Sequence, residues 1–177
     1  MTVRAFILFL HVAAAVGLFA VDAIEWVSLR GLARSLTYEQ ARDWSGLGRL
    51  LILIGLPATL LALASGTYLA TTEGLWRVTW AFVAVPAYVG VMVAGGIAGP
   101  RRRRLDAVLK NGAGSLPREL WRQIRHPVLI ASWRLRTALL IGILFIMTAR
   151  PSWAVWAIVS FAALGVIWSV PALREDS

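Results

Sequence analysis

Three titratable side chains interrupt the apolar stretch HVAAAVGLFAVDAIEWV, residues 11–27 of a 177-residue chain. An α-helix turns by about 100° per residue, so Asp22 lies about 20° and Glu25 about 40° around the axis from His11. The imidazole and both carboxylates therefore share one helix face. Charged groups are costly inside a membrane and normally face the protein interior, where they pair with one another. The sequence thus predicts buried partners for the two carboxylates.

The later apolar stretch that begins HPVLIASWRLRT supplies positive partners. Arg134 and Arg136 are about 200° apart on a helix, so only one of them can point toward the first apolar helix. We expect Arg134 to pair with Asp22 and Glu25, and Arg136 to extend toward the membrane surface. If the helices are rotated differently from this expectation, Arg136 or Arg30 pairs with the carboxylates in place of Arg134. Such a cluster either fixes how the helices pack or handles protons or a ligand.

His11 lies about 16 Å along the helix from Asp22 and needs other neighbours. One interpretation is a neutral imidazole bonded to a hydroxyl or carbonyl. The other is a metal-ligating His11, either as an axial ligand of haem b or as a copper ligand. We expect no cofactor and keep haem b or copper as the alternative. Candidate ligand-binding side chains at a similar depth lie in two other apolar segments: Ser65, Thr67, Tyr68, Met147 and Thr148.

The composition indicates that these residues belong to a membrane protein. Hydrophobic residues make up 59% of the chain and charged residues only 15%, far from the averages of soluble domains. The chain has no cysteine, which excludes disulfides and cysteine-ligated metal centres. No catalytic triad, P-loop, dinucleotide fingerprint or zinc motif occurs in the sequence. An enzyme is therefore the less expected class.

Five apolar segments are long enough to cross a bilayer, for which about 20 residues are needed. The last is barely long enough, which leaves four to five spans. Pro57 and Pro86 predict kinks in the second and third segments. The expected fold is all-α, a single membrane-embedded helical bundle over residues 1–177. The five segments run from about residue 3 to beyond 22, 50 to 71, 76 to 98, 127 to 151 and 152 to 170.

Lysine and arginine distinguish the two sides of this predicted bundle. Twelve of them lie in or beside two loops, at about residues 27–48 and 99–128. The opposite side has only Arg4, Arg77 and Arg150. Because positively charged loops stay in the cytoplasm, we expect the N-terminus outside and the C-terminus in the cytoplasm.

The formal charge of +9 is concentrated in these two loops. In a soluble protein this charge would suggest nucleic acid, which we do not expect beside membrane spans. The run GPRRRR lies where arginine attracts anionic phospholipid headgroups. We expect such contacts from Arg101, Arg102, Arg103 and Arg104.

Two short helices are expected in the cytoplasmic loops. Thr37 and Gln40 have capping-box spacing, which predicts a helix beginning in TYEQARDWSGL. In the second loop, Ser115 is the expected N-cap, with Pro117 and Glu119 in the first turn.

Small residues and tryptophans bear on packing and partners. Gly95 and Gly99 have the GxxxG spacing that lets another helix approach closely, in this chain or in a second copy. A homodimer or a larger membrane complex is compatible with this surface. Most tryptophans, such as Trp76 and Trp121, are predicted to anchor at the membrane interfaces.

Three segments resemble a known group of proteins: FLHVAAAVGLF around His11, SGTYLA in the second span and SWRLRTALLIGILFIMTARP in the fourth. Together they resemble small uncharacterised bacterial integral membrane proteins, a domain family of unknown function distantly similar to the CopD copper-resistance membrane proteins. Residues 16–19, VGLF, stand where these families commonly carry a Trp-Val-Gly-Gly-like segment. The resemblance implies a compact helical bundle in a bacterial inner membrane and supplies no reaction.

Two functions are open from the sequence. The first is a bundle without catalysis that binds a lipid or small ligand, or joins a larger membrane complex, with a structural ion-pair cluster. The second is a haem- or copper-binding redox protein, or a proton-coupled transport protein, that uses His11.

Overall fold

The structure is a computed structural model that describes residues 2–174, with side chains described except at 49–51 and 170–174. Within this range no strand occurs, and one isolated β-bridge joins Thr37 to Ser115. The prediction of an all-α fold is therefore confirmed. The helices, in chain order, are α1 (Val3–Arg34), α2 (Tyr38–Gly46), α3 (Gly48–Leu53), α4 (Gly55–Thr72), the 3-10 helix η1 (Leu75–Arg77), α5 (Thr79–Asn111), α6 (Arg118–Ile124), α7 (Pro127–Ala149) and α8 (Ala154–Arg174).

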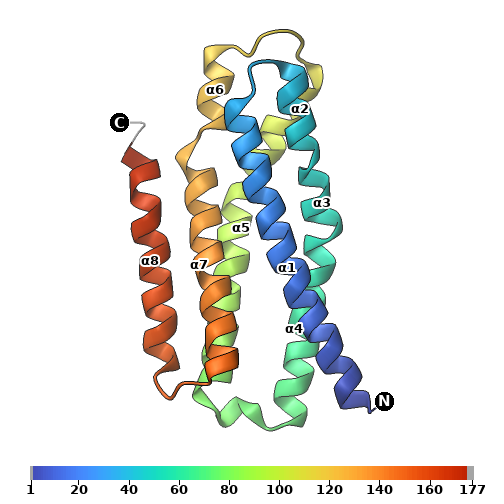
Figure 1. Ribbon diagram of the computed structural model, residues 1–177, viewed down its shortest axis with the longest axis vertical. Coiled ribbons are helices and arrows are strands. Elements are labelled where there is room, and N and C mark those ends of the chain that lie inside the picture. Colours follow the sequence, from blue (N-terminus) through green and yellow to red (C-terminus); the bar gives the residue numbers. More distant parts are fainter. Residues whose placement is uncertain (1, 175–177) are drawn as a thin grey trace.

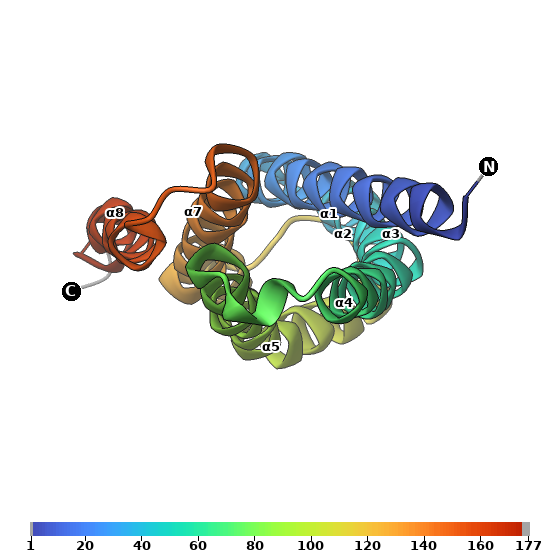
Figure 2. The same ribbon diagram turned by 90° about the horizontal axis from the view of Figure 1, so that it is seen from below.

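The helices α1, α4, α5 and α7 surround a common interior, and α8 lies outside this group against α7 (Figure 2). The short helices α2 and α6 lie together at one end of the bundle. The N-terminus, η1 and the connection from α7 to α8 lie at the other end (Figure 1). The long helices therefore alternate in direction, and both long loops meet at one end.

Three helical segments are long and apolar enough to cross a membrane: Val3–Arg34, Thr79–Asn111 and Arg118–Ala149. A shorter apolar helix covers Ala154–Ser169. Large apolar side chains cover the outside of the bundle, and Phe82 and Trp156 are 67% and 71% exposed. An apolar outer surface is typical of helices surrounded by acyl chains.

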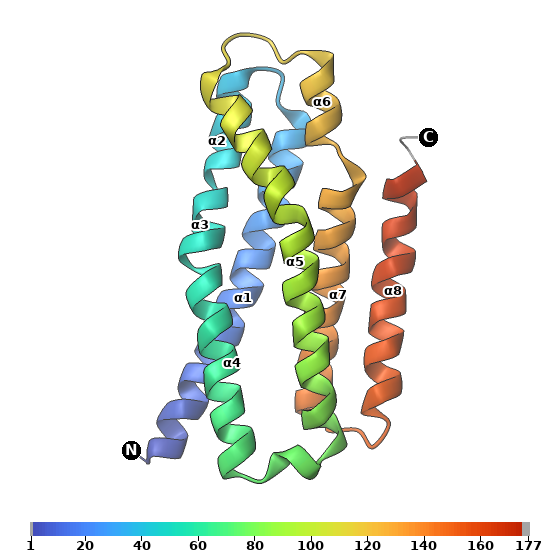
Figure 3. The ribbon, with the colours of Figure 1, turned by 180° about the vertical axis from the view of Figure 1, so that it is seen from behind.

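The predicted second span is divided. α3 ends at Leu53 and α4 begins at Gly55, with Ile54 in a turn between them. Pro57 has no N–H to donate to the carbonyl of Leu53, four residues earlier, and its ring crowds that carbonyl. The predicted kink is therefore a break in the helix. By contrast, α5 continues through Pro86 as one helix that bends along its length (Figure 3).

One of the two capping predictions is confirmed and the other is wrong. Thr37 is the N-cap of α2, and its hydroxyl accepts a hydrogen bond from the Gln40 N–H at 3.3 Å. In the second loop α6 begins at Arg118, with Pro117 rather than Ser115 at the N-cap. Ser115 instead lies in extended backbone, bridged to the first loop. α6 therefore begins three residues after the bridge, directly after Pro117.

Candidate functional site

Four charged side chains from three helices form an ion-pair cluster: Asp22 and Glu25 on α1, Arg102 on α5 and Arg136 on α7. Arg136 Nη2 lies 3.3 Å from Asp22 Oδ1 and also pairs with Glu25 Oε2. Arg102 Nη1 lies 3.2 Å from Glu25 Oε1. The two arginine side chains are 16% and 13% exposed and the carboxylates less than 10%. The cluster is thus largely covered and balanced in charge.

Neutral groups bond the rest of the cluster. The Thr137 hydroxyl donates to Asp22 Oδ2 at 2.6 Å. Arg102 Nη2 donates to Ser28 Oγ at 2.7 Å, and that hydroxyl donates to the Trp44 carbonyl at 2.9 Å. The network therefore connects α1, α2, α5 and α7. All four carboxylate oxygens of the cluster accept a hydrogen bond or an ion pair from within the chain.

The expectation that Arg134 pairs with the α1 carboxylates is corrected, because Arg136 takes that place. Arg134 lies on the other side of α7, where Nη1 donates to the Trp168 carbonyl at 2.5 Å and the guanidinium lies 5.2 Å from the Trp168 ring centroid. α7 lies between α1 and α8 (Figure 2). Two arginines about 200° apart on α7 must therefore face different neighbours.

Arg102 was expected at the lipid headgroups, but it belongs to the cluster. Its neighbours in the arginine run, at positions 101, 103 and 104, are exposed. The buried residues Ala98, Leu105 and Leu109 mark the inward face of α5. Arg102 shares this face because it lies four residues after Ala98 and three before Leu105. This periodicity is the sequence signal that identifies Arg102 as inward-facing.

An aromatic stack beside the cluster includes a residue that the sequence analysis did not single out. Trp133 on α7 stacks on Trp26 of α1, with ring centroids 4.3 Å apart, and contacts Trp168 of α8 edge-on at 5.4 Å. Its indole N–H donates to the backbone carbonyl of Asp22 at 3.0 Å. Trp133 is buried, so it joins α1 to α8 across α7 and does not serve as an interface anchor.

A second polar region lies in the half of the bundle nearer the N-terminus. There a cavity of about 300 Å³ opens between α1, α4, α5 and α7. We call it the His11 cavity. Its walls are mainly leucine, alanine and aromatic side chains. Its volume is at the low end of the range for small-molecule sites, which are typically apolar with a few placed polar groups.

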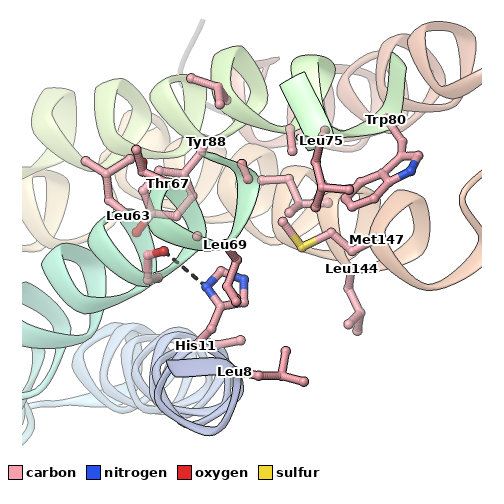
Figure 4. A pocket seen from close by; sticks show the side chains of 18 of the residues that line it. Leu8, His11, Leu63, Thr67, Leu69, Leu75, Trp80, Tyr88, Leu144 and Met147 are labelled. Atoms are coloured by element: carbon pink, nitrogen blue, oxygen red, sulfur yellow. Dashed lines mark hydrogen bonds between the residues drawn. The ribbon is translucent and has the colours of Figure 1, made fainter. Parts of the chain in front are cut away.

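His11 projects from α1 into this cavity (Figure 4). Its Nδ1 lies 3.1 Å from the Ala62 carbonyl and 3.1 Å from Ser65 Oγ, both on α4. A carbonyl oxygen only accepts, so Nδ1 must carry the proton. In the neutral imidazole, Nε2 then has a free lone pair. Within residues 2–174 no hydrogen bond engages Nε2, and it lies on the cavity side of the ring (Figure 4).

Gly66 makes room for this imidazole. A Cβ at position 66 would lie 2.9 Å from His11 Cε1, closer than side-chain atoms pack. The pair Ser65-Gly66 therefore acts twice on His11, because the serine hydroxyl bonds its Nδ1 and the glycine admits its ring.

The remaining ligand-binding candidates separate into three groups. Thr67 and Met147 line the His11 cavity with His11 itself, and Figure 4 shows Met147 on the α7 side. Ser65 is buried and touches the cavity only through the imidazole that it binds. Tyr68 and Thr148 lie outside the lining, and the Thr148 hydroxyl donates to the Leu144 carbonyl at 2.8 Å. The structure thus brings three of the six candidates to one cavity.

The charged residues of the described cavity lining lie at one end. Arg4 Nε donates to Glu73 Oε1 at 2.7 Å, and the Arg150 guanidinium lies 5.4 Å from the Trp80 ring centroid. The hydrogen bond from Arg4 holds the pKa of the Glu73 carboxyl below its usual range, and the positive charge of Arg150 acts in the same direction. The lining therefore carries two guanidiniums and one carboxylate.

The donors for a metal or haem in this cavity are few. His11 Nε2 and the Met147 thioether are donors that suit copper(I) or haem iron. Among the described residues, no group of three or more His, Cys, Asp or Glu side chains could hold a metal ion. His11 and Met147 are therefore the candidates to hold such a group.

Comparison with protein-family models, curated proteins and solved structures finds no match for this chain. Its function is therefore inferred from its own geometry.

Proposed function

We propose that this protein is a multi-pass protein of a bacterial cytoplasmic membrane that binds an apolar small molecule or lipid in the His11 cavity. In this proposal it has no catalytic activity. The ion-pair cluster holds the helices together, and the protein acts alone, as a homodimer or within a larger membrane complex.

The arrangement of the helices supports five spans with the N-terminus outside. α4 and α8 complete a set of five alternating helices with the three long apolar ones (Figure 1). The arginine-rich loops gather at one end, and the positive-inside rule assigns that end to the cytoplasm. The exposed residues Arg101, Arg103 and Arg104 would meet anionic headgroups there.

The free Nε2 of His11 in an apolar cavity is the observation that carries the binding proposal. His11 is partly buried, and a ligand that donates a hydrogen bond would give Nε2 the partner that the described residues do not supply. The surrounding apolar wall provides most of the contact area, and the His11 nitrogen helps to orient the ligand. The carboxylate oxygens of the ion-pair cluster offer no such opening, because they are already bonded.

Photolabelling tests this proposal. A long-chain alcohol that carries a diazirine is irradiated with the protein in neutral-lipid nanodiscs, and mass spectrometry locates the label. We expect label on the cavity walls of α1, α4, α5 and α7. Ala15→Phe fills the cavity and should reduce labelling by about tenfold, because Ala15 lines it. Ala13→Phe is the matched control, because Ala13 is exposed on the same helix.

His11→Leu should weaken competition by the unlabelled alcohol by about fivefold, the size of one hydrogen bond. Label spread evenly over lipid-facing residues, with no difference between Ala15→Phe and Ala13→Phe, would overturn the proposal.

A haem- or copper-binding function is the second candidate. Met147 favours it, because it lines the same cavity as the free imidazole nitrogen. This candidate predicts a Soret band or bound copper in protein purified from haem- or copper-supplied cells. His11→Ala should abolish the signal and Met147→Leu should alter it. Protein without haem absorption or copper under these conditions would eliminate the candidate.

A further inference from the structure

Arg150 has an unusual backbone conformation for its residue type. It ends α7 in the left-handed region, with φ 47° and ψ 47°, and its N–H donates to the Ile146 carbonyl. The other described residues with positive φ are Gly74 and Gly114. Glycine or asparagine normally fills such a helix-ending position, because a side chain with a Cβ is strained there. The backbone conformation therefore does not explain why this position is an arginine, so a role for its side chain is the alternative.

The Arg150 side chain lies at the charged end of the His11 cavity. Its guanidinium lies 5.4 Å from the Trp80 ring centroid, and both residues line the cavity. A cation over an aromatic ring still has its N–H donors free in the guanidinium plane. Within residues 2–174 no ion pair or hydrogen bond engages those donors. Glu73, the nearby carboxylate, is bonded to Arg4.

The charges at this end favour an anion. Arg4, Arg150 and Glu73 together leave one net positive charge, and they are the only charged residues of the described lining. Arg4 uses Nε for Glu73. A carboxylate or phosphate could receive two parallel N–H donors from Arg150, which is the strongest arrangement for such groups.

The shape of the cavity favours a chain-like apolar body. Its α1 wall extends from Arg4 to Phe19, which is about 22 Å at 1.5 Å per residue. A volume of about 300 Å³ over this length suits one narrow chain better than a compact ring system. The charged residues are confined to the outer end of this length.

From the conformation of Arg150, its free guanidinium and the long apolar cavity, we infer that the ligand is an anionic amphiphile with one acyl chain. Arg150 binds its carboxylate or phosphate headgroup at the cavity mouth, and the chain lies along α1, where a hydroxyl or amide N–H on the natural ligand donates to His11 Nε2. This inference rests on the proposed function, since it specifies the ligand of the same cavity.

Competition against the diazirine alcohol tests the ligand class. The competitors are hexadecanoate, hexadecyl phosphate, hexadecanol and hexadecylamine, each in neutral-lipid nanodiscs. The two anions should compete at about tenfold lower concentration than the alcohol, because their bonds to Arg150 are charge-assisted. Lysophosphatidylglycerol is a further arm. If it matches hexadecanoate, the natural source is a bilayer lipid; if only the small anions compete, the source is a free fatty acid.

Arg150→Asn should remove the preference for anions and leave competition by hexadecanol unchanged. Asparagine tolerates the left-handed conformation, so this variant preserves the turn. Arg77→Asn is the matched control, because Arg77 is exposed at the same end and does not line the cavity.

Equal competition by anions and alcohol in the unmodified protein would overturn the inference and leave the proposed function intact. A preference for anions that survives Arg150→Asn would overturn the role of Arg150. Labelling that none of the competitors reduces would instead contradict the proposed function itself.

Discussion

The ion-pair cluster and the His11 cavity both place polar side chains of α1 among apolar helices, but they differ in how those groups are satisfied. In the cluster, each carboxylate oxygen of Asp22 and Glu25 has a partner within the chain. In the cavity, the chain satisfies one nitrogen of His11 and leaves the other free. The carboxylates of the cluster are thus fully paired, with Arg102 Nε its buried atom without a partner among the described residues, whereas the free nitrogen of His11 faces a cavity and carries our binding proposal.

The largest predicted effect comes from breaking the cluster. Arg136→Met leaves two buried carboxylates without their shared guanidinium and should lower the free energy of unfolding by about 3–5 kcal/mol. Thermal unfolding in detergent measures this loss. Arg103→Met is the control, because Arg103 is exposed on α5.

Replacing all four charged residues together, with asparagine, glutamine and two methionines, should cost much less than Arg136→Met, because no charge is left unpaired. Equal losses from the single and quadruple variants would mean that the cluster does not act as a charge-balanced unit.

Gly66→Ala tests how tightly the His11 ring is held in the cavity. Its methyl group would meet the His11 ring at 2.9 Å, so the imidazole must move and leave its α4 partners. Overpacking of this kind costs about 1–3 kcal/mol, and labelling of the cavity should fall with it. Gly96→Ala is the control, because nothing lies within 4 Å of a Cβ at that position. A Gly66→Ala variant with unchanged stability and labelling would show that the imidazole position is not constrained.

Arg150→Gly should have a smaller effect, of the opposite sign on stability. Glycine adopts the left-handed conformation of residue 150 without strain, so the free energy of unfolding should rise by about 1 kcal/mol. The same variant should lose the preference for anionic ligands. Thermal unfolding and the competition assay together measure the two effects. If Arg150→Gly were less stable than the unmodified protein, the claim that Arg150 is strained in this conformation would be wrong.

The smallest effect concerns the exposed pair of Arg4 and Glu73. Because the pKa of Glu73 is lowered in the folded protein by Arg4 and Arg150, its contribution to stability is complete above the ordinary glutamate pKa of about 4.3. That contribution disappears as the pH falls through the lowered pKa. The melting temperatures of the unmodified protein and Glu73→Gln should therefore differ at pH 7 and converge in acid. A difference that persists below pH ~3 would exclude this ion pair as its cause.

The helices that carry both regions could be predicted from hydropathy and capping, as the N-cap at Thr37 shows. Two features of the fold, the break before α4 and the start of α6, did not follow from these local patterns. A proline in the sequence does not show whether a helix will bend or break. α5 bends and continues through Pro86, whereas the helix before α4 is interrupted close to Pro57. α6 begins after Pro117 and not after Ser115, which is bridged to Thr37 far away in the sequence.

The candidate site was less predictable, because it depends on helix rotation. The sequence shows that Arg134 and Arg136 face different ways, but only the position of α7 between α1 and α8 decides which of them meets Asp22. Arg102 looks like the other arginines of its run in the sequence. Its inward position follows from the helical spacing to its buried neighbours Ala98 and Leu105. The His11 ring is held by Ser65, which the sequence offered as a candidate, and by the Ala62 carbonyl and Gly66, whose side chains give no such signal.

The position of α8 outside the other helices has a consequence for how the molecule is divided. No described side chain of α8 lines the His11 cavity or belongs to the ion-pair cluster. Its packing depends largely on α7, where Gly165 brings the two backbones close, with Leu135 Cα 3.2 Å from where a Cβ would stand. The described cavity lining and the ion-pair cluster are therefore both formed without α8. Substitutions on the outward face of α8, such as at the exposed Trp156, should therefore leave both regions undisturbed.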